Sequence, residues 1–502
     1  MMAGERRRSR GGSGEVGGRG CGAVRHDDRW GRVLRRVSGI FAVGWLLAAG
    51  LPAGLWGQDA GSPVAVEPGA WVRDYLSVAW LRGEAGRSGS RDALVPADLA
   101  ASLLCGEGQA RGACDRLLRG YGAGDGMATR VGAWAALADE GAGTIGAALS
   151  LLGGNWGIRV LPGVSTGKAE TFEVAHLSAG WRVSEHVLLM AGRAAFSFGP
   201  GVMGGLVRGA ADTLGYAAVQ VRALTLPRGF GEADLFSSLS RLSADRPGSP
   251  RAWWWTTRLV YAPVASLELA LNRSVLFGGE GAAVLDPSVR RILYMLIGKH
   301  NTVVTDSGAF DFDNQIVSFD VVWRLPGLPV AVYGEWGGED SSGSFARVPG
   351  WRLGGRAAWA GGFRGYAGLE FGGLSRSRDG NPPWYTHGTL GAYVNRGRPL
   401  GHPLGGHGWE LRGTVFASDR DARWRVRATL FQREREAENA LGPLGRSTGG
   451  SVRFELEPYA GFEIVANGDF EAFRRSELRD ETGFSLGVRY VHGPAGFSGG
   501  AR

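Results

Sequence analysis

Basic residues gather in the longest stretch that we predict to connect two strands. Arg290, Arg291, Lys299 and His300 fall within residues 276–314. Guanidinium and ammonium groups donate charge-assisted hydrogen bonds to carboxylates, so this stretch would suit an acidic polymer. A long loop that folds over an opening only to seal it explains the same residues equally well.

Two further connections carry residues that could contact a ligand. Arg193 and Phe198 stand where the predicted loop 197–213 begins, just before and within a Phe-Gly-Pro-Gly sequence. An aromatic face can pack against a ring, and a glycine-rich backbone can approach a ligand closely or simply make a compact turn. Arg396 and Arg398 lie at the tip of a later hairpin that is rich in hydrogen-bond donors.

The elements that must position such residues are β-strands, as residues 315–338 show most clearly. Side chains alternate across a strand, and this stretch alternates between apolar and polar residues in both halves. The apolar face holds Val317, Phe319, Val321, Trp323, Leu325, Leu328, Val330, Val332 and Trp336, and the polar face holds Ser318, Asp320, Arg324, Tyr333 and Glu335. A two-residue turn at Pro326-Gly327 would place Asp320 opposite Tyr333 and Ser318 opposite Glu335, although Pro-Gly better suits a type II turn.

Polar residues on the inner face of a closed sheet have two interpretations. Asp320, Arg324, Tyr333 and Glu335 are candidate ligand-binding residues. Inward polar groups must also pair with one another once a sheet closes, and this structural role explains the same residues.

The strand pattern recurs along the chain and predicts an all-β fold. Apolar faces with tryptophan at their margins, together with polar opposite faces, are typical of an outer-membrane barrel, in which short turns and long loops occupy opposite rims. We predict about eighteen strands, at 128–138, 143–152, 171–183, 186–196, 214–224, 231–242, 252–262, 265–275, 315–325, 328–337, 351–359, 364–373, 385–395, 408–417, 423–433, 449–457, 461–471 and 483–491. Long loops are predicted at 197–213, 276–314, 338–350, 374–384 and 434–448. The chain is therefore expected to be a transmembrane antiparallel β-barrel.

The net charge of +8 comes largely from the start of the chain. Residues 1–36 contain ten arginines and four acidic residues, so the rest holds 46 of the 56 basic and 44 of the 48 acidic residues. A nearly neutral remainder argues against a nucleic-acid partner.

The N-terminal residues predict export. Basic residues before an apolar stretch at Val37–Leu51 indicate a signal peptide within residues 1–57. Helical spacing in residues 58–125 predicts a small periplasmic helical region, in which Cys105 and Cys114 could form a disulfide or remain two free thiols.

Four stretches resemble the Wzi-type capsule assembly family of outer-membrane proteins. They are RAAFSFGPGVMGGL (193–206), LELALNRSVLFGGEG (267–281), the run from Asp313 to Asp340, and GTLGAYVNRGRPLGHPLG (388–405). The resemblance implies a monomeric barrel of about eighteen strands with a helical periplasmic portion. We place the barrel at residues 126–491, and the C-terminal tail at 492–502 is not part of the family pattern. It also implies a lectin-like role in which the protein binds capsular polysaccharide and promotes its attachment at the cell surface.

Other functions are weaker alternatives. A porin or diffusion channel would share the barrel. No Ser-His-carboxylate pattern supports an enzyme. His402 and His407 have no carboxylate or cysteine at ligand spacing, so neither a metal nor a cofactor is expected. Trp253, Trp254 and Trp255 are predicted to be interfacial residues of the barrel exterior.

Overall fold

The computed structural model describes most of the chain from Ala128 onwards. The described residues are 128–138, 143–152, 156–166, 171–184, 186–201, 204–209, 213–280, 302–305, 308–311, 313–339, 348–376, 384–387, 390–419, 423–441, 444–459, 462–474 and 481–492. The predicted signal peptide, helical region, Cys105–Cys114 pair and most of the C-terminal tail lie outside them, as do Arg290, Arg291, Lys299 and His300. Those predictions remain predictions.

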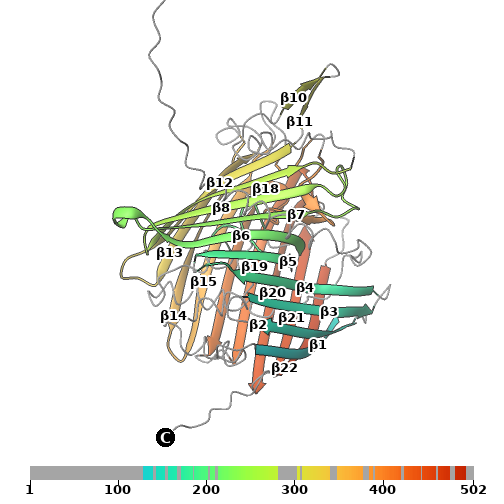
Figure 1. Cartoon of the computed structure of the whole chain (residues 1–502), viewed down its shortest axis with the longest axis vertical. Coiled ribbons are helices and arrows are strands. Elements are labelled where there is room, and N and C mark those ends of the chain that lie inside the picture. The colour runs from blue at the N-terminus through green and yellow to red at the C-terminus, as the bar shows by residue number, and fades with distance from the viewer. Residues whose placement is uncertain are drawn as a thin grey trace, which may run out of the picture. The chain divides into compact units, whose positions relative to one another are not determined.

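Eighteen strands form one antiparallel sheet (Figure 1). They are β1 (Ala128–Ala138), β2 (Gly143–Leu152), β3 (Trp156–Thr166), β4 (Thr171–Arg182), β5 (Val187–Ala194), β6 (Leu214–Thr225), β7 (Glu232–Arg241), β8 (Trp253–Val264), β9 (Leu267–Phe277), β12 (Asp313–Arg324), β13 (Val330–Glu339), β14 (Gly350–Ala360), β15 (Phe363–Leu374), β18 (Gly406–Asp419), β19 (Trp424–Asn439), β20 (Gly445–Tyr459), β21 (Phe462–Arg474) and β22 (Glu481–His492). Two small hairpins, β10–β11 (Thr302–Thr305, Gly308–Asp311) and β16–β17 (Val394–Asn395, Arg398–Pro399), and the 3-10 helix η4 (Pro227–Gly229) lie in the connections.

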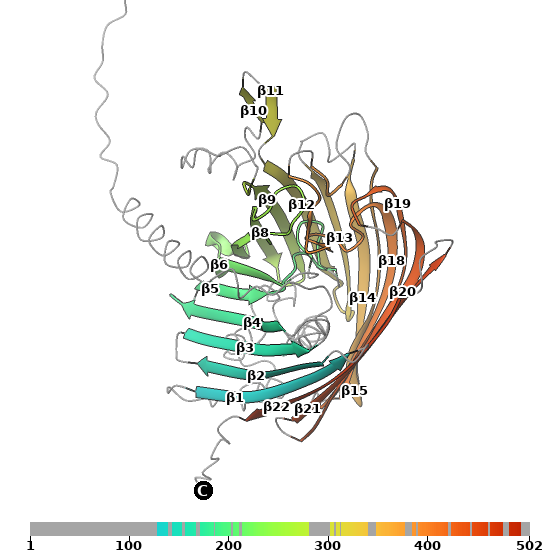
Figure 2. The ribbon, with the colours of Figure 1, turned by 90° about the vertical axis from the view of Figure 1, so that its right-hand side faces the viewer.

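The sheet closes into a barrel. Each strand pairs with the next of the eighteen along the chain, and β22 also pairs with β1, from Val131 opposite His492 to Ala138 opposite Ser485. Figure 2 shows β22 running beside β1 where the sheet returns to its start. Closure leaves the sheet with no edge strand, which is the arrangement that spans a bilayer with strands.

The predicted strand count is confirmed, but one predicted strand is wrong and one observed strand was missed. β3 was not expected, because Pro162 and two glycines interrupt its apolar pattern; the ladder with β4 shifts its register between Leu161 and Pro162 to accommodate the proline. Residues 385–395 were expected to be a barrel strand, but only β16 at Val394–Asn395 is extended there. Their apolar residues are buried inside the barrel instead.

The two rims differ in the length of their connections. One rim carries short turns, such as Ala265–Ser266 between β8 and β9 and the two residues 361–362 between β14 and β15. The other carries the long connections 195–213, 278–312 and 375–405, whereas the loop predicted at 434–448 is mostly strand. In outer-membrane barrels the long loops are extracellular, so we refer to these rims as periplasmic and extracellular.

The β12–β13 hairpin confirms the alternation and corrects the predicted register. Phe319 and Trp336 are 53% and 47% exposed on the outer surface, whereas Asp320 and Glu335 are buried inside. Asp320 lies opposite Glu335, two residues away from the predicted register.

The turn of this hairpin explains the shift. The Leu328 N–H donates to the Leu325 carbonyl (3.2 Å) and Gly327 has a φ of +73°, as in a type II turn with Pro326 at its second position. The strands resume pairing beyond Pro329, which has no N–H to donate, with the Leu325 N–H bonded to the Val330 carbonyl (2.8 Å).

The outer surface carries an apolar belt of the kind that contacts lipid. Its exposed members on neighbouring strands include Leu259, Leu271, Phe319, Val321, Val332, Leu353, Leu369, Val415, Leu430, Val452 and Phe484. No helix among the described residues is long and apolar enough to cross a membrane. The belt and the closed sheet define a barrel whose strands contact the bilayer.

Candidate binding site

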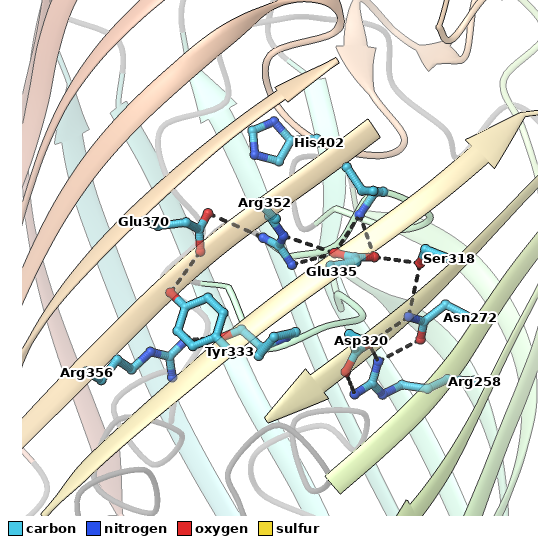
Figure 3. Close-up of polar contacts among 12 residues, drawn as sticks. Arg258, Asn272, Ser318, Asp320, Tyr333, Glu335, Arg352, Arg356, Glu370 and His402 are labelled. Carbon is cyan, nitrogen blue, oxygen red and sulfur yellow. Dashed lines mark hydrogen bonds and ion pairs between the residues drawn. The ribbon is translucent and has the colours of Figure 1, made fainter. Parts of the chain in front are cut away.

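The centre of the inner wall is a carboxylate that joins the wall to a loop. Glu335 on β13 accepts hydrogen bonds from Nε and Nη2 of Arg352 on β14 (2.9 and 2.7 Å) and from Oγ of Ser318 on β12 (2.6 Å). It also accepts the backbone N–H of Leu206, in the connection between β5 and β6, at 3.1 and 3.2 Å. Glu335 therefore holds three strands and an extracellular loop together (Figure 3).

The same network continues towards β8. Arg258 forms two hydrogen bonds with Asp320 (2.5 and 3.1 Å), and Asn272 on β9 contacts both of them (2.6 and 2.7 Å). The Asn272 amide also donates to Ser318 (3.1 Å), which connects this group to Glu335. A two-pronged Arg–carboxylate contact fixes both side chains in one geometry.

In the other direction the network reaches β15. Arg352 Nη1 lies 3.3 Å from Glu370 Oε1, and the Tyr333 hydroxyl donates to Glu370 Oε2 (3.0 Å). Arg356 lies over the Tyr333 ring, 5.2 Å from its centroid, and donates to the carbonyl of Pro200. The Gly-Pro-Gly sequence thus lies on the charged wall: a Cβ on Gly201 would stand 1.9 Å from Arg352 Nη1.

A second charged group covers the inner face of β18–β21. Arg425 pairs with Glu455 (2.7 Å) and Glu463, Arg453 pairs with Glu455 (2.6 Å), and Arg412 pairs with Glu410. Cross-strand pairs of opposite charge are an ordinary way to satisfy an inward polar face. This part of the lumen wall is therefore a ladder of ion pairs.

The extracellular half of the lumen is filled by a plug. We define the plug as residues 195–209 and 384–405, of which 202–203 and 388–389 are not described. Phe198, Leu206, Tyr385, Tyr393 and Leu404 are at most 1% exposed and belong to one apolar cluster with wall residues. The plug and the wall share a single hydrophobic core.

Two tyrosines bind the halves of the plug to each other and to the wall. The Tyr385 hydroxyl donates to the Leu206 carbonyl (2.6 Å) and accepts the His402 N–H (2.8 Å). The Tyr393 hydroxyl accepts a hydrogen bond from Trp254 Nε1 (2.8 Å) and contacts the Val207 carbonyl (2.9 Å). Burial raises the pKa of both hydroxyls, so both remain protonated.

His402 is buried between the plug and the charged wall. Burial lowers its pKa to about 4, although the nearby Glu410 and Glu370 carboxylates oppose the shift. Its Nδ1 accepts the backbone N–H of Leu404 (3.2 Å), which requires that nitrogen to be unprotonated. The imidazole is therefore neutral at physiological pH.

One part of the plug segment reaches solvent. In the β16–β17 hairpin, Arg396 and Gly397 both have positive φ values (51° and 71°), as a tight type I′ turn requires. Asn395 at its base is buried and accepts hydrogen bonds from the N–H and Oγ of Ser243 (both 2.8 Å). Arg398 is exposed and Arg396 is half-buried, so a rigid base at the extracellular rim presents two guanidinium groups.

The structure places the other predicted site residues in different environments. Asp320, Tyr333 and Glu335 lie in the network, and Arg324 shares their inward face at the periplasmic end of β12. Phe198 is buried in the plug against Phe236. Arg193 is buried on β5, where the register places it on the opposite face from the inward Leu188 and Met190.

Several residues of the site escaped the sequence prediction. They all occupy inward positions of strands whose side chains alternate between faces, namely Arg258, Asn272, Arg352, Arg356 and Glu370. This alternation was the signal that could have identified them. Trp254 was predicted to be interfacial, but it faces the lumen and is 1% exposed because its indole N–H bonds to Tyr393. Among the described residues, no group of three His, Cys, Asp or Glu side chains is arranged to hold a metal ion.

The closed sheet, the outward apolar belt, the polar inner wall and the long-loop rim define an outer-membrane β-barrel with a plugged lumen. The sequence profile of the family described as capsule assembly protein Wzi matches residues 145–484. The chain belongs to this family.

A solved structure shows the same fold. Wzi of Escherichia coli, described as an outer-membrane protein involved in group 1 capsule assembly and as a carbohydrate-binding β-barrel, has 21% sequence identity and a TM-score of 0.64, covering 84% of this chain and 97% of its own. OpdK of Pseudomonas aeruginosa, another outer-membrane protein, is more distant, with 13% identity, a TM-score of 0.43 and coverage of 73% and 98%. No curated protein sequence matches the chain.

Proposed function

We propose that this protein binds an acidic capsular or other surface polysaccharide at the extracellular rim and promotes attachment of the polymer to the cell. The proposal involves binding without catalysis. Membership of the capsule assembly family supports it, as does the carbohydrate binding described for the E. coli protein of the same fold.

The plug is the observation that carries the proposal. Its buried tyrosines fill the extracellular half of the lumen and are hydrogen-bonded to the wall. A filled lumen does not suit a diffusion channel, and it leaves the extracellular rim as the surface available to a large polymer. Arg396 and Arg398 lie at this rim and can donate to carboxylates of an acidic polymer.

The experiment measures cell-bound and released polysaccharide after deletion of the gene and its restoration. We expect deletion to release polymer into the medium and the wild-type gene to restore its attachment. The double variant Arg396→Ser/Arg398→Ser should restore much less, because it lacks both guanidinium groups of the β16–β17 hairpin. Polymer that stays attached in the deletion strain would contradict the proposal.

A matched control separates binding from surface charge. Arg423 is exposed in the turn between β18 and β19 at the periplasmic rim, where surface polymer has no access. Arg423→Ser should restore attachment as well as the wild type does. Equal amounts of all variants in the outer membrane, measured by immunoblot, are required for the comparison.

Conductance distinguishes the proposal from the porin alternative. We expect the purified wild-type protein to give no steady current in planar bilayers. A variant that lacks residues 384–405 should conduct if it still folds as a barrel, which shows that the assay detects an open lumen. Steady wild-type current would favour the porin.

A further inference from the structure

The outer face of β19–β21 carries a charged layer above the apolar belt. Leu430, Gly450 and Phe470 are in register, and Leu430 and Phe470 are 62% and 43% exposed. Four residues closer to the extracellular rim, about 13 Å along the strand, Glu434, Arg446 and Arg474 are in register on the same outward face. This height corresponds to the boundary between the apolar belt and the extracellular surface, where lipid headgroups lie.

Arg446 and Arg474 are direct cross-strand partners. Like charges that face each other across a ladder are unfavourable unless an anion lies between them. Among the described residues neither guanidinium forms an ion pair, and Arg474 is exposed. Within the described part of the chain, no carboxylate forms an ion pair with either cation.

The surrounding side chains hold Arg446 in place without neutralising it. Its Nη2 donates to the Gln432 side-chain oxygen (3.2 Å), and its guanidinium lies 5.3 Å from the centroid of the Trp409 ring. Its Nε is buried and has no partner. A guanidinium fixed by an amide and an aromatic face keeps its remaining donors for an external acceptor.

The two nearby carboxylates are turned towards β18. Glu434 accepts a hydrogen bond from Trp409 Nε1 (3.2 Å), and Glu436 lies 3.6 Å from Nε2 of His407. Both acids therefore contact the strand on the side away from Arg474. Neither of these two carboxylates is therefore directed towards β21.

We propose that Arg446 and Arg474 form a binding site for the phosphate group of an outer-leaflet lipid. Phosphate oxygens can accept hydrogen bonds from two guanidinium groups at once, and the apolar belt below them accommodates acyl chains. Outward position and height favour a lipid over the polymer of the proposed function, whose site we place at the rim. The inference does not depend on that function.

The test measures binding of bisphosphorylated lipid A to the detergent-purified protein by native mass spectrometry. We expect Arg446→Gln/Arg474→Gln to bind it at least fivefold more weakly than the wild type. Arg474→Lys should retain most of the affinity, because it keeps a cation at the site. Binding should also weaken as the salt concentration rises.

Arg241→Gln is the matched control. Arg241 is also an exposed outward arginine at the extracellular end of its strand, and it lies 5.3 Å from the ring of Trp253, but a tryptophan and not a second arginine stands opposite it. This variant should bind lipid A within twofold of the wild type. Heat-modified gel mobility checks that every variant is a folded barrel.

Three further molecules test which ligand occupies the site. Lipid A stripped of phosphate should bind at least fivefold more weakly, and inorganic phosphate should not displace the intact lipid at equal concentration. Wild-type affinity in the double glutamine variant would overturn the proposal, as would equal binding of the stripped lipid. Displacement by uronic-acid oligosaccharide in the wild type, absent in the double variant, would assign the site to the polymer and overturn the lipid assignment.

Discussion

Two regions of the lumen wall bind the plug by different means. On β5–β8 the inward residues are largely apolar, and Tyr216, Phe236 and Trp254 pack with plug residues in one core. On β12–β15 they are charged, and they bind backbone atoms of the plug, namely the Leu206 N–H and the Pro200 carbonyl. Apolar packing tolerates small changes of shape, whereas a buried carboxylate requires each of its partners.

A substitution in the apolar region should have the largest effect on stability. Tyr393→Ala removes a fully buried ring and should lower the free energy of unfolding by about 4 kcal/mol. Tyr393→Phe keeps the ring and loses only the hydroxyl contacts, for about 1–2 kcal/mol. Urea unfolding in lipid vesicles measures the free energy of unfolding of both variants. Equal losses would show that hydrogen bonds, and not packing, bind the plug to this region of the wall.

In the charged region, replacing a single side-chain atom should reduce stability nearly as much. Glu335→Gln leaves the buried Arg352 guanidinium beside a neutral amide instead of a carboxylate, and it should lower the free energy of unfolding by about 3 kcal/mol. Glu280→Gln is the control, because Glu280 pairs with Arg251 while both side chains are about half exposed, and it should cost about 0.5 kcal/mol or less. Similar values for the two variants would contradict the structural importance of the network.

A smaller change tests how closely the loop backbone lies on the charged wall. The added methyl of Gly201→Ala would meet Arg352 and Glu370, so we expect a loss of about 2 kcal/mol and faster proteolysis of the plug. Gly413→Ala has open space around the new methyl and should change stability by about 0.5 kcal/mol or less. A tolerated Gly201→Ala would mean that the loop moves away from the wall at little cost.

The smallest effect should come from pH. His402 has a pKa of about 4 when folded and an ordinary value of about 6.5 when unfolded, so the unfolded chain gains a proton first as the pH falls. The folded state should lose about 1 kcal/mol between about pH 7 and about pH 5.5, and more as the pH approaches 4. His402→Gln should remove this part of the pH dependence of unfolding, and an unchanged pH profile would show that His402 is not its source.

The barrel could be predicted from the sequence because the alternation that indicates it is local. Alternation along residues 315–338 needs no knowledge of neighbouring strands, and the polar face of that hairpin was assigned correctly. The predicted register was wrong because Pro329, and not only Pro326-Gly327, determines where pairing resumes. The predictions for residues 385–395 and for Trp254 were wrong for another reason. Apolar residues inside a plugged lumen have the same composition as those that face lipid.

The network itself could not be predicted from spacing alone. Glu335 meets Arg352 and Ser318 only because three ladders have particular registers, and it meets Leu206 only because a loop 129 residues away folds inward. Alternation identifies which residues face inward. It does not identify their partners.

The pairing of β1 with β22 constrains how the barrel is made. Val131 lies opposite His492, so its partner is synthesised 361 residues later. Until β22 arrives, β1 has one unsatisfied edge in a bilayer that offers no substitute hydrogen bonds. The strands can therefore pair in sequence, but stable insertion must wait for the last strand, which removes the open edge.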